Sequence, residues 1–195
     1  LLIIEVEGAE EEMAAQLARI SKIARDFAPV EIREARSEDE ARRIWLGRKS
    51  AFGAMGQMAD YMCLDGTIPV SELSFVLRRI AELSAGYGLK VANVFHAGDG
   101  NMHPLILYNA NDPEDLARCE ALGADILRLC VEVGGCLTGE HGVGVEKRDL
   151  MEVQFAPADL EAQMQIKDVF DPHWLLNAAK VFPLTVSQSR REGRA

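Results

Sequence analysis

The sequence lacks features that would assign it to several specialised classes of protein. It has no excess of positive charge, because 21 lysines and arginines stand against 31 aspartates and glutamates and leave a formal net charge of −10. No apolar run approaches the roughly 18 residues that a membrane-spanning helix needs, and the first residues do not resemble a signal peptide. We therefore expect no transmembrane segment and no binding to nucleic acid or anionic lipid, both of which attract basic surfaces.

Paired cysteines are also missing. The four cysteines, Cys63, Cys119, Cys130 and Cys136, form no CxxC motif and show no spacing typical of a disulfide framework. We expect reduced thiols in packed or surface positions, assign them no metal, and place the protein in the cytoplasm.

What is present is the composition of an ordinary globular protein. The 195 residues are 48% hydrophobic and 27% charged, which suits a substantial core in one large domain or in two small fused ones. The sequence starts at Leu1 without a methionine and enters an apolar stretch at once, so we expect it to be part of a longer protein.

Hydrophobic periodicity predicts both strands and helices in the first part of the chain. The apolar runs at residues 1–7 and 30–35 are typical of strands, and residues 10–27 carry apolar side chains at helical spacing. Ser37, with Glu40 three residues later, forms a capping-box pattern that predicts the start of a second helix.

From residue 60 to residue 138 the predicted order is strand, helix, strand, strand, helix, strand. Residues 60–69 form the first strand, Ser71 is the expected N-cap of the first helix, and Asp112 with Pro113 begins the second. A short strand at residues 136–138 completes the series. This order is the split βαβ pattern of ferredoxin-like domains, an antiparallel sheet with helices packed on it.

The predicted fold class is therefore α+β, with four parts along the chain. Residues 1–60 would form a first, incomplete ferredoxin-like half, and residues 61–145 a second half that carries the site motifs. This duplication rests on topology alone, because we find no repeat at the level of residues. Residues 146–186 would form a helical C-terminal segment, and the polar tail at residues 187–195 is expected to fray.

Two histidines flank a Gly-Asp-Gly turn in residues 91–108, VANVFHAGDGNMHPLILY. If the turn places His96 opposite Asn101, His103 lies on the same face of the hairpin, roughly 7 to 8 Å away along the diagonal. Two imidazoles at that separation can bind one metal ion, with Glu140 from the LTGEHGVGV stretch as a third ligand. The plainer alternatives are that each histidine is a hydrogen-bonding group and that Asp99 serves only the turn.

The motifs of this chain resemble those of a known family, the C-terminal domain of the FAD-linked oxidases of the vanillyl-alcohol oxidase superfamily. The matching stretches are DYMCLDGTIP, HAGDGNMHP, LTGEHGVGVEKR and DPHWLLNAAKVFP. Within the family the resemblance is greatest to the glycolate oxidase D subunit and to the D-lactate and D-2-hydroxyglutarate dehydrogenases. It implies a substrate, or cap, domain of ferredoxin-like topology that follows an FAD-binding domain.

The resemblance also implies roles for single residues. His96 and His103 match two histidine ligands of a divalent metal, and Glu140 matches its carboxylate ligand. His141 then stands at the place of the catalytic base, and Arg48, in WLGRKSAF, at that of the arginine that binds the substrate carboxylate.

The C-terminal motif implies contacts with the cofactor. Asn177 and Lys180 match the Asn and Lys of the family's LNPGKVFP motif, which lies near flavin and substrate. We expect Asn177 to contact both the substrate and the FAD, and Lys180 to contact the FAD. Ala178 and Ala179 stand where the family has Pro-Gly, so the local turn departs from the pattern.

The function implied by the resemblance is transfer of a hydride from a small 2-hydroxy acid, of the glycolate or D-lactate type, to FAD, with zinc, manganese or iron assisting. The chain alone would be inactive without the FAD-binding domain. The expected partners are that upstream domain, other oxidase subunits, through which the protein can lie at a membrane, and a second copy in a homo-oligomer. A metal-dependent hydrolase, which would act without flavin, and a non-catalytic binding or assembly module remain alternatives.

Overall fold

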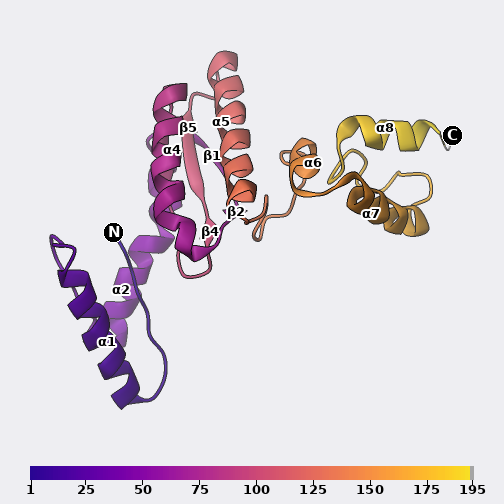
Figure 1. Ribbon diagram of the computed structural model, residues 1–195. Helices are drawn as coiled ribbons and strands as arrows, with labels where there is room; N and C mark the ends of the chain where they lie inside the picture. The colour runs from indigo at the N-terminus through magenta and orange to yellow at the C-terminus, as the bar shows by residue number, and fades with distance from the viewer. Residues whose placement is uncertain (194–195) are drawn as a thin grey trace. The chain divides into compact units, whose positions relative to one another are not determined.

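The chain forms two compact units in the computed structural model, which describes residues 1–193 (Figure 1). The first unit is Leu1–Gly53 and the second is Ala54–Ala195. The first unit contains the helices α1 (Glu10–Arg25) and α2 (Glu38–Lys49), and α3 (Ala51–Gly56) crosses the boundary.

The cap predicted for α2 is confirmed. The Ser37 side chain accepts a hydrogen bond from the backbone N–H of Glu40 at 3.3 Å, which satisfies one of the free donors at the start of the helix. The Glu40 carboxylate accepts from the N–H of Arg36 at 2.7 Å. The reciprocal bond of the capping box is therefore displaced by one residue from the expected donor, Ser37.

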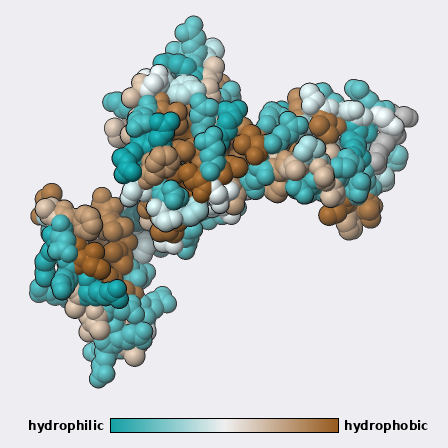
Figure 2. All heavy atoms as spheres, viewed as in Figure 1, coloured by the Kyte–Doolittle hydropathy of each residue, from teal (hydrophilic) through white to brown (hydrophobic). Residues whose placement is uncertain are grey.

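The strands predicted at residues 1–7 and 30–35 are wrong, because residues 1–59 contain no strand. A strand requires a neighbour whose backbone pairs with its own N–H and C=O groups, and within residues 1–59 neither stretch has one. Their apolar side chains are exposed instead, as at Leu1, Leu2 and Val30, and Figure 2 shows apolar residues on the surface of this unit. Residues 1–59 thus supply no strand for a second ferredoxin-like copy, and the four-part division of the chain stays a prediction.

The second unit contains an antiparallel sheet in the order β1-β5-β3. Both β1 (Asp60–Cys63) and β3 (Lys90–Asn93) pair with β5 (Pro104–Tyr108). Between β1 and β3 the chain forms α4 (Leu73–Tyr87), after β5 it forms α5 (Pro113–Glu132), and the two helices lie side by side on the sheet (Figure 1). This arrangement confirms the predicted α+β class with a split βαβ order.

The second unit also contains a smaller, two-stranded sheet. The strand predicted at residues 60–69 is interrupted after Cys63, and its second part, β2 (Gly66–Thr67), pairs with β4 (Asn101–Met102). The strand predicted at residues 136–138 is reduced to one bridge between Thr67 and Cys136. The interruption leaves Leu64 and Asp65 between β1 and β2.

The two helices of the second unit begin in different ways. The Asp112 side chain accepts from the N–H of Glu114 at 2.9 Å, so the cap predicted for α5 is confirmed. The cap predicted at Ser71 is wrong, because Ser71 lies inside a 3-10 turn, η1 (Val70–Glu72), and Glu72 precedes α4 without a side-chain cap.

The core of the second unit lies between the sheet and its two helices. Its most buried members come from α4, α5, β4 and β5, are at most 1% exposed, and include Val76, Ile80, Leu122, Ile126 and Ile106. The helical members recur at a spacing of four residues, as the sequence predicted, and so form one stripe along each helix.

The cysteines behave as the sequence predicted. All four lie within residues 1–193 and are free thiols. Burial raises the pKa of Cys63 and of Cys119 to about 11, and that of Cys130 to about 12. These three thiols are therefore protonated and poorly nucleophilic at neutral pH.

Short helices follow the sheet. They are η2 (Arg148–Leu150), α6 (Met151–Gln154), α7 (Pro157–Phe170) and α8 (Leu184–Glu192). The helix α8 extends through much of the tail, whose expected fraying from residue 187 stays a prediction, and residues 194–195 lie outside the described residues. None of the helices within residues 1–193 combines the length and the apolar character needed to cross a bilayer.

Left-handed backbone is concentrated between α7 and α8. Four of the five non-glycine residues with positive φ in residues 1–193 lie there, namely Trp174, Asn177, Ala179 and Val181. Ala179, at φ 61°, occupies the position at which the resembling motif has glycine. Because left-handed backbone costs a residue with a Cβ roughly 1–2 kcal/mol, the turn is kept at Ala179 but strained.

Ala179→Gly is expected to raise the free energy of unfolding by about 1 kcal/mol, because glycine adopts positive φ without a steric penalty. Ala178 is the matched control, since its φ is not positive, and Ala178→Gly should lower the free energy of unfolding by roughly 0.5–1 kcal/mol. Urea unfolding followed by circular dichroism measures both changes. An Ala179→Gly variant less stable than the wild type would contradict strain at this turn.

Candidate metal centre

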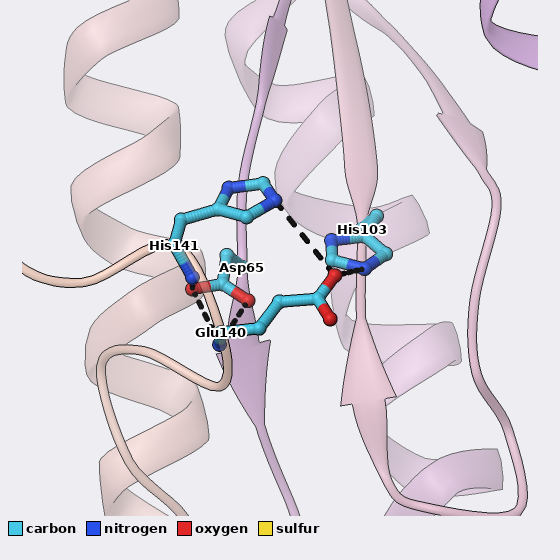
Figure 3. A group of neighbouring side chains, drawn as sticks. All are labelled: Asp65, His103, Glu140 and His141. Atoms are coloured by element: carbon cyan, nitrogen blue, oxygen red, sulfur yellow. Dashed lines mark hydrogen bonds and ion pairs between the residues drawn. The ribbon is translucent and has the colours of Figure 1, made fainter.

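Four side chains with metal-binding atoms meet in the second unit (Figure 3). Asp65 lies between β1 and β2, His103 between β4 and β5, and Glu140 and His141 in the loop after α5. One potential ligand atom of each lies within 4.8 Å of those of the others. The structure thus brings together three residues that the sequence singled out and adds Asp65.

The hairpin pairs as the sequence predicted. His96 lies opposite Asn101, and its N–H donates to the Asn101 carbonyl at 3.0 Å. The ring centroids of His96 and His103 are 5.6 Å apart with planes at 85°. His96 is exposed and is not among the four grouped residues, so it adjoins His103 without joining the group.

His103 is held in one orientation by its surroundings. The residue is 2% exposed, and its Nδ1 lies 3.1 Å from the carbonyl oxygen of Leu64. Because a carbonyl oxygen can only accept a hydrogen bond, Nδ1 must carry the proton and donate. Nε2 then points at Oε1 of Glu140, 3.0 Å away.

The pair of His103 and Glu140 needs a positive charge, which either a proton on Nε2 or a bound metal ion supplies. In a neutral imidazole whose Nδ1 is protonated, Nε2 is an acceptor, and a carboxylate oxygen is an acceptor as well. Two acceptors 3.0 Å apart repel each other unless a proton or a metal ion lies between or beside them. Zinc binds imidazole nitrogen at about 2.0–2.1 Å and carboxylate oxygen at about 2.0–2.2 Å, which is compatible with both atoms as ligands of one ion.

The side chains of Glu140 and His141 are accessible from outside. They are 54% and 46% exposed, and Nε2 of His141 lies 3.9 Å from Oε1 of Glu140. The ring of His141 stacks on that of His103, with centroids 5.2 Å apart and planes at 14°. A small molecule could therefore reach Glu140 and His141, while His103 forms the buried wall behind them.

Asp65, to which the sequence gave no role, is the most strongly bound polar group of the centre. Its carboxylate is 0% exposed and accepts hydrogen bonds from a hydroxyl, an ammonium and three consecutive backbone N–H groups. The donors are Thr138 Oγ1 (2.6 Å), Lys147 Nζ (3.0 Å) and the nitrogens of Gly139 (3.0 Å), Glu140 (3.0 Å) and His141 (2.9 Å). With its oxygens occupied in this way, Asp65 is suited to hold the loop at residues 138–142, which we name the EH loop.

These donors keep Asp65 ionised. Burial alone would raise the pKa of its carboxyl group, but hydrogen bonds from the Thr138 hydroxyl, from the N–H of His141 and from the Lys147 ammonium outweigh burial. The net result is a pKa well below the ordinary value for aspartate. Asp65 and Lys147 therefore form a buried ion pair at neutral pH.

Gly139 is required in the EH loop by close packing. A Cβ at this position would lie 2.7 Å from Oδ1 of Asn101 and 2.8 Å from Cγ2 of Thr67. The sequence suggested that glycines here bring backbone close to a ligand. At Gly139 the backbone instead lies close to side chains of β2 and β4, which seats the EH loop on the smaller sheet.

The other predicted site residues lie outside this group. Arg48 belongs to the first unit, where its guanidinium lies over the ring of Phe52 at 5.6 Å from the centroid. Asn177 and Lys180 are exposed in the left-handed segment, with Lys180 Nζ 3.3 Å from Asn177 Oδ1. That segment is bonded to the stretch after the EH loop, because the N–H of Val181 donates to the carbonyl of Gly144 at 2.8 Å.

Comparison with known families identifies the chain. The family described as FAD linked oxidases, C-terminal domain, matches residues 1–181. The chain belongs to this family. The resemblance inferred from the sequence motifs is therefore confirmed, and the centre described above is part of an FAD linked oxidase C-terminal domain.

Relatives of this C-terminal domain include glycolate oxidase subunits and D-lactate dehydrogenases. The glycolate oxidase subunit GlcD of Escherichia coli K12 is 48% identical over 94% of this chain and 37% of its own length. The GlcD subunit of Bacillus subtilis is 32% identical over 93% of the chain and 39% of its length. The D-lactate dehydrogenase of Archaeoglobus fulgidus is 31% identical over 93% and 38%. The chain thus spans well under half the length of these relatives.

Asp65→Asn is expected to lower the free energy of unfolding by about 3 kcal/mol at pH 7, because it leaves the Lys147 ammonium buried without its counter-charge. The folded-state pKa of Asp65 is lowered, so its contribution is complete above the unfolded pKa of about 3.9 and is lost as the pH falls towards the folded value. The difference between variant and wild type should therefore shrink below about pH 4.

Denaturant unfolding between pH 3 and pH 8 measures this dependence. Asp99 in the hairpin turn is exposed, and Asp99→Asn serves as the control, with an expected effect within about 0.5 kcal/mol. An Asp65→Asn cost that stays constant across this pH range would contradict the ionised state of Asp65 in the folded protein.

Proposed function

We propose that this chain is the substrate domain of a flavin-dependent oxidoreductase that oxidises a small 2-hydroxy acid of the glycolate or D-lactate type. The proposal is carried by the convergence of His103 Nε2 and Glu140 Oε1, 3.0 Å apart, beside the ring of His141. Membership of the FAD linked oxidase family supports FAD as the redox cofactor, and the names of the relatives support the substrate class. The chain is inactive without the FAD-binding domain.

The residues fit a divalent metal ion. His103 and Glu140 can offer two acceptor atoms to one cation, and we assign His96, beside His103, as the third ligand. Imidazole and carboxylate ligands suit zinc, manganese or iron. A metal ion held there would supply Lewis-acid polarisation of the hydroxyl and carboxylate oxygens of the substrate.

The proton of the substrate hydroxyl goes to His141. Its Nε2 faces the same point as the carboxylate of Glu140, at 3.9 Å, and its half-exposed ring is open to a substrate. A neutral imidazole accepts a proton readily near pH 7. FAD, when bound, would supply the two-electron acceptor for the hydride on the carbon that bears this hydroxyl.

The remaining assignments rest on the family motifs. Arg48 binds the substrate carboxylate by a bidentate contact, Asn177 contacts substrate and flavin, and Lys180 contacts the flavin. The partners are the FAD-binding domain, other oxidase subunits and a second copy of the protein, a proposal supported by the word subunit in the names of two relatives. We place the protein in the cytoplasm, or at a membrane through those subunits.

His103→Ala is expected to weaken zinc or manganese binding at least 100-fold, because it removes the buried ligand of the centre. Metal content after dialysis against each ion, measured by mass spectrometry, checks this. His173 is exposed in the C-terminal segment, and His173→Ala is the control that should keep the wild-type content. Equal metal content in the wild type and in His103→Ala would remove the ligand assignment.

The same measurement distinguishes His96, the proposed ligand, from His141, the proposed base, both of which have their rings beside that of His103. His96→Ala should lower the metal affinity at least tenfold, whereas His141→Ala should change it less than about threefold, because a base is not a ligand. The reverse result would exchange the two assignments and make His141 the ligand.

His141→Asn is expected to slow flavin reduction by 10²- to 10⁴-fold when the chain is joined to its FAD-binding domain, because general-base catalysis contributes about that much. Stopped-flow absorbance with glycolate, D-lactate and D-2-hydroxyglutarate measures the rate and ranks the substrates. In the control variant His173→Asn, the substrate should reduce the flavin at the wild-type rate.

Full-speed flavin reduction by His141→Asn would exclude His141 as the base. Ester or amide hydrolysis by the chain in the absence of flavin would instead favour a metal-dependent hydrolase.

A further inference from the structure

We infer that Asp65 is a positioning residue of the candidate metal centre. Its buried carboxylate sets the backbone of the EH loop so that Glu140 and His141 face His103. The inference rests on the proposed function, because it concerns how the metal ligands and the base are held. Asp65 itself is assigned no contact with metal or substrate.

The position of Asp65 in the chain links both halves of the centre. The carbonyl of Leu64 accepts from Nδ1 of His103 at 3.1 Å, and the backbone carbonyl of Asp65 accepts from the N–H of Gly139 at 2.8 Å. Leu64 and Asp65 are consecutive residues at the break between β1 and β2. Leu64 therefore orients the buried His103, and the next residue, Asp65, orients the EH loop.

The EH loop is held by its backbone. The N–H groups of Gly139, Glu140 and His141 all point at the Asp65 carboxylate, at 2.9 to 3.0 Å. Successive N–H groups that converge in this way form a concave site for an anion. Three consecutive residues cannot change φ and ψ freely while these bonds are made, so the Cα–Cβ directions of Glu140 and His141 are fixed as well.

Packing does not replace this restraint. The side chains of Glu140 and His141 are 54% and 46% exposed, so about half of each surface has no protein neighbour. A buried side chain such as His103 is positioned by its surroundings, whereas a half-exposed one depends mainly on its own backbone. The geometry of Glu140 and His141 is therefore set largely by the bonds to Asp65.

The charge of Asp65 is balanced within the site. Lys147 Nζ lies 3.0 Å from the carboxylate, and both side chains are at most 5% exposed. Without this ammonium, the buried negative charge of Asp65 would repel the nearby carboxylate of Glu140. The ion pair allows an anion to hold the EH loop directly beside the carboxylate of Glu140.

The test measures Co²⁺ binding to the full 195-residue chain by its visible absorption. Asp65→Asn keeps the shape of the side chain but replaces an acceptor oxygen with an amide donor that faces N–H groups. We expect it to weaken Co²⁺ binding 10- to 100-fold, the usual effect of a residue that orients metal ligands. Ile126→Val, in the core of the same unit, is the structural control and should leave the affinity within about twofold.

A second readout does not depend on metal. In the metal-free wild type, NMR should show a nuclear Overhauser effect between the rings of His103 and His141, which stack at 5.2 Å. This effect should disappear in Asp65→Asn, while the contact between Trp174 and Phe182, at 5.6 Å, is kept. A core mutation that merely destabilises the protein would not remove one contact and spare the other.

The outcomes separate this inference from the proposed function. If the wild type binds no Co²⁺ but the ring contact is lost in Asp65→Asn, the metal assignment is wrong and the positioning role is supported. A folded Asp65→Asn protein with wild-type Co²⁺ affinity and an intact ring contact would overturn the positioning role and leave the metal centre.

Two further variants test the same bonds if Asp65→Asn does not fold. Thr138→Val removes the 2.6 Å hydroxyl bond to Asp65 at nearly constant volume, and Lys147→Met removes the ammonium while keeping an unbranched chain. Each should weaken Co²⁺ binding about three- to tenfold. Unchanged affinity in both would overturn the inference.

Discussion

An ionised carboxylate that is removed from water must be surrounded by donors, and those of Asp65 come from residues 73 to 82 positions later in the chain. Their N–H, O–H and ammonium groups can satisfy it only after α5 has brought the EH loop back to the break between β1 and β2. The centre consequently belongs to the tertiary structure of the second unit and to no single motif. Its precision follows from the cost of leaving any of these groups unbonded in the interior.

Local signals were sufficient for much of the fold. The caps at Ser37 and Asp112 depend on residues two or three positions away, so the sequence predicts them directly. The same holds for the hairpin, where the Gly-Asp-Gly turn fixes the pairing of His96 with Asn101 and hence the side on which His103 lies. A two-residue periodicity and a tight turn determine register without any knowledge of the rest of the chain.

Features that depend on distant partners were not predictable in this way. Residues 1–7 have the composition of a buried strand, but a strand exists only where another strand pairs with it, and composition does not reveal that partner. Asp65 stands before Gly66 and so suggests nothing more than a turn, while its real partners lie beyond α5. The proximity of His103 and Glu140 could be anticipated because the family motifs contain both, but the buried ion pair beneath them has no local pattern.

The segment after the EH loop limits where residues can be inserted into or deleted from such a domain. Lys147 and Arg148 are neighbours, yet Lys147 reaches back to Asp65 at 3.0 Å while Arg148 reaches forward to the carbonyl of Ala179 at 2.7 Å. Loops usually tolerate insertions and deletions, because their ends alone are anchored. Here a residue lost between Glu140 and Arg148 would strain one of the two bonds, whereas an added residue can bulge into solvent, so this segment tolerates insertion better than deletion.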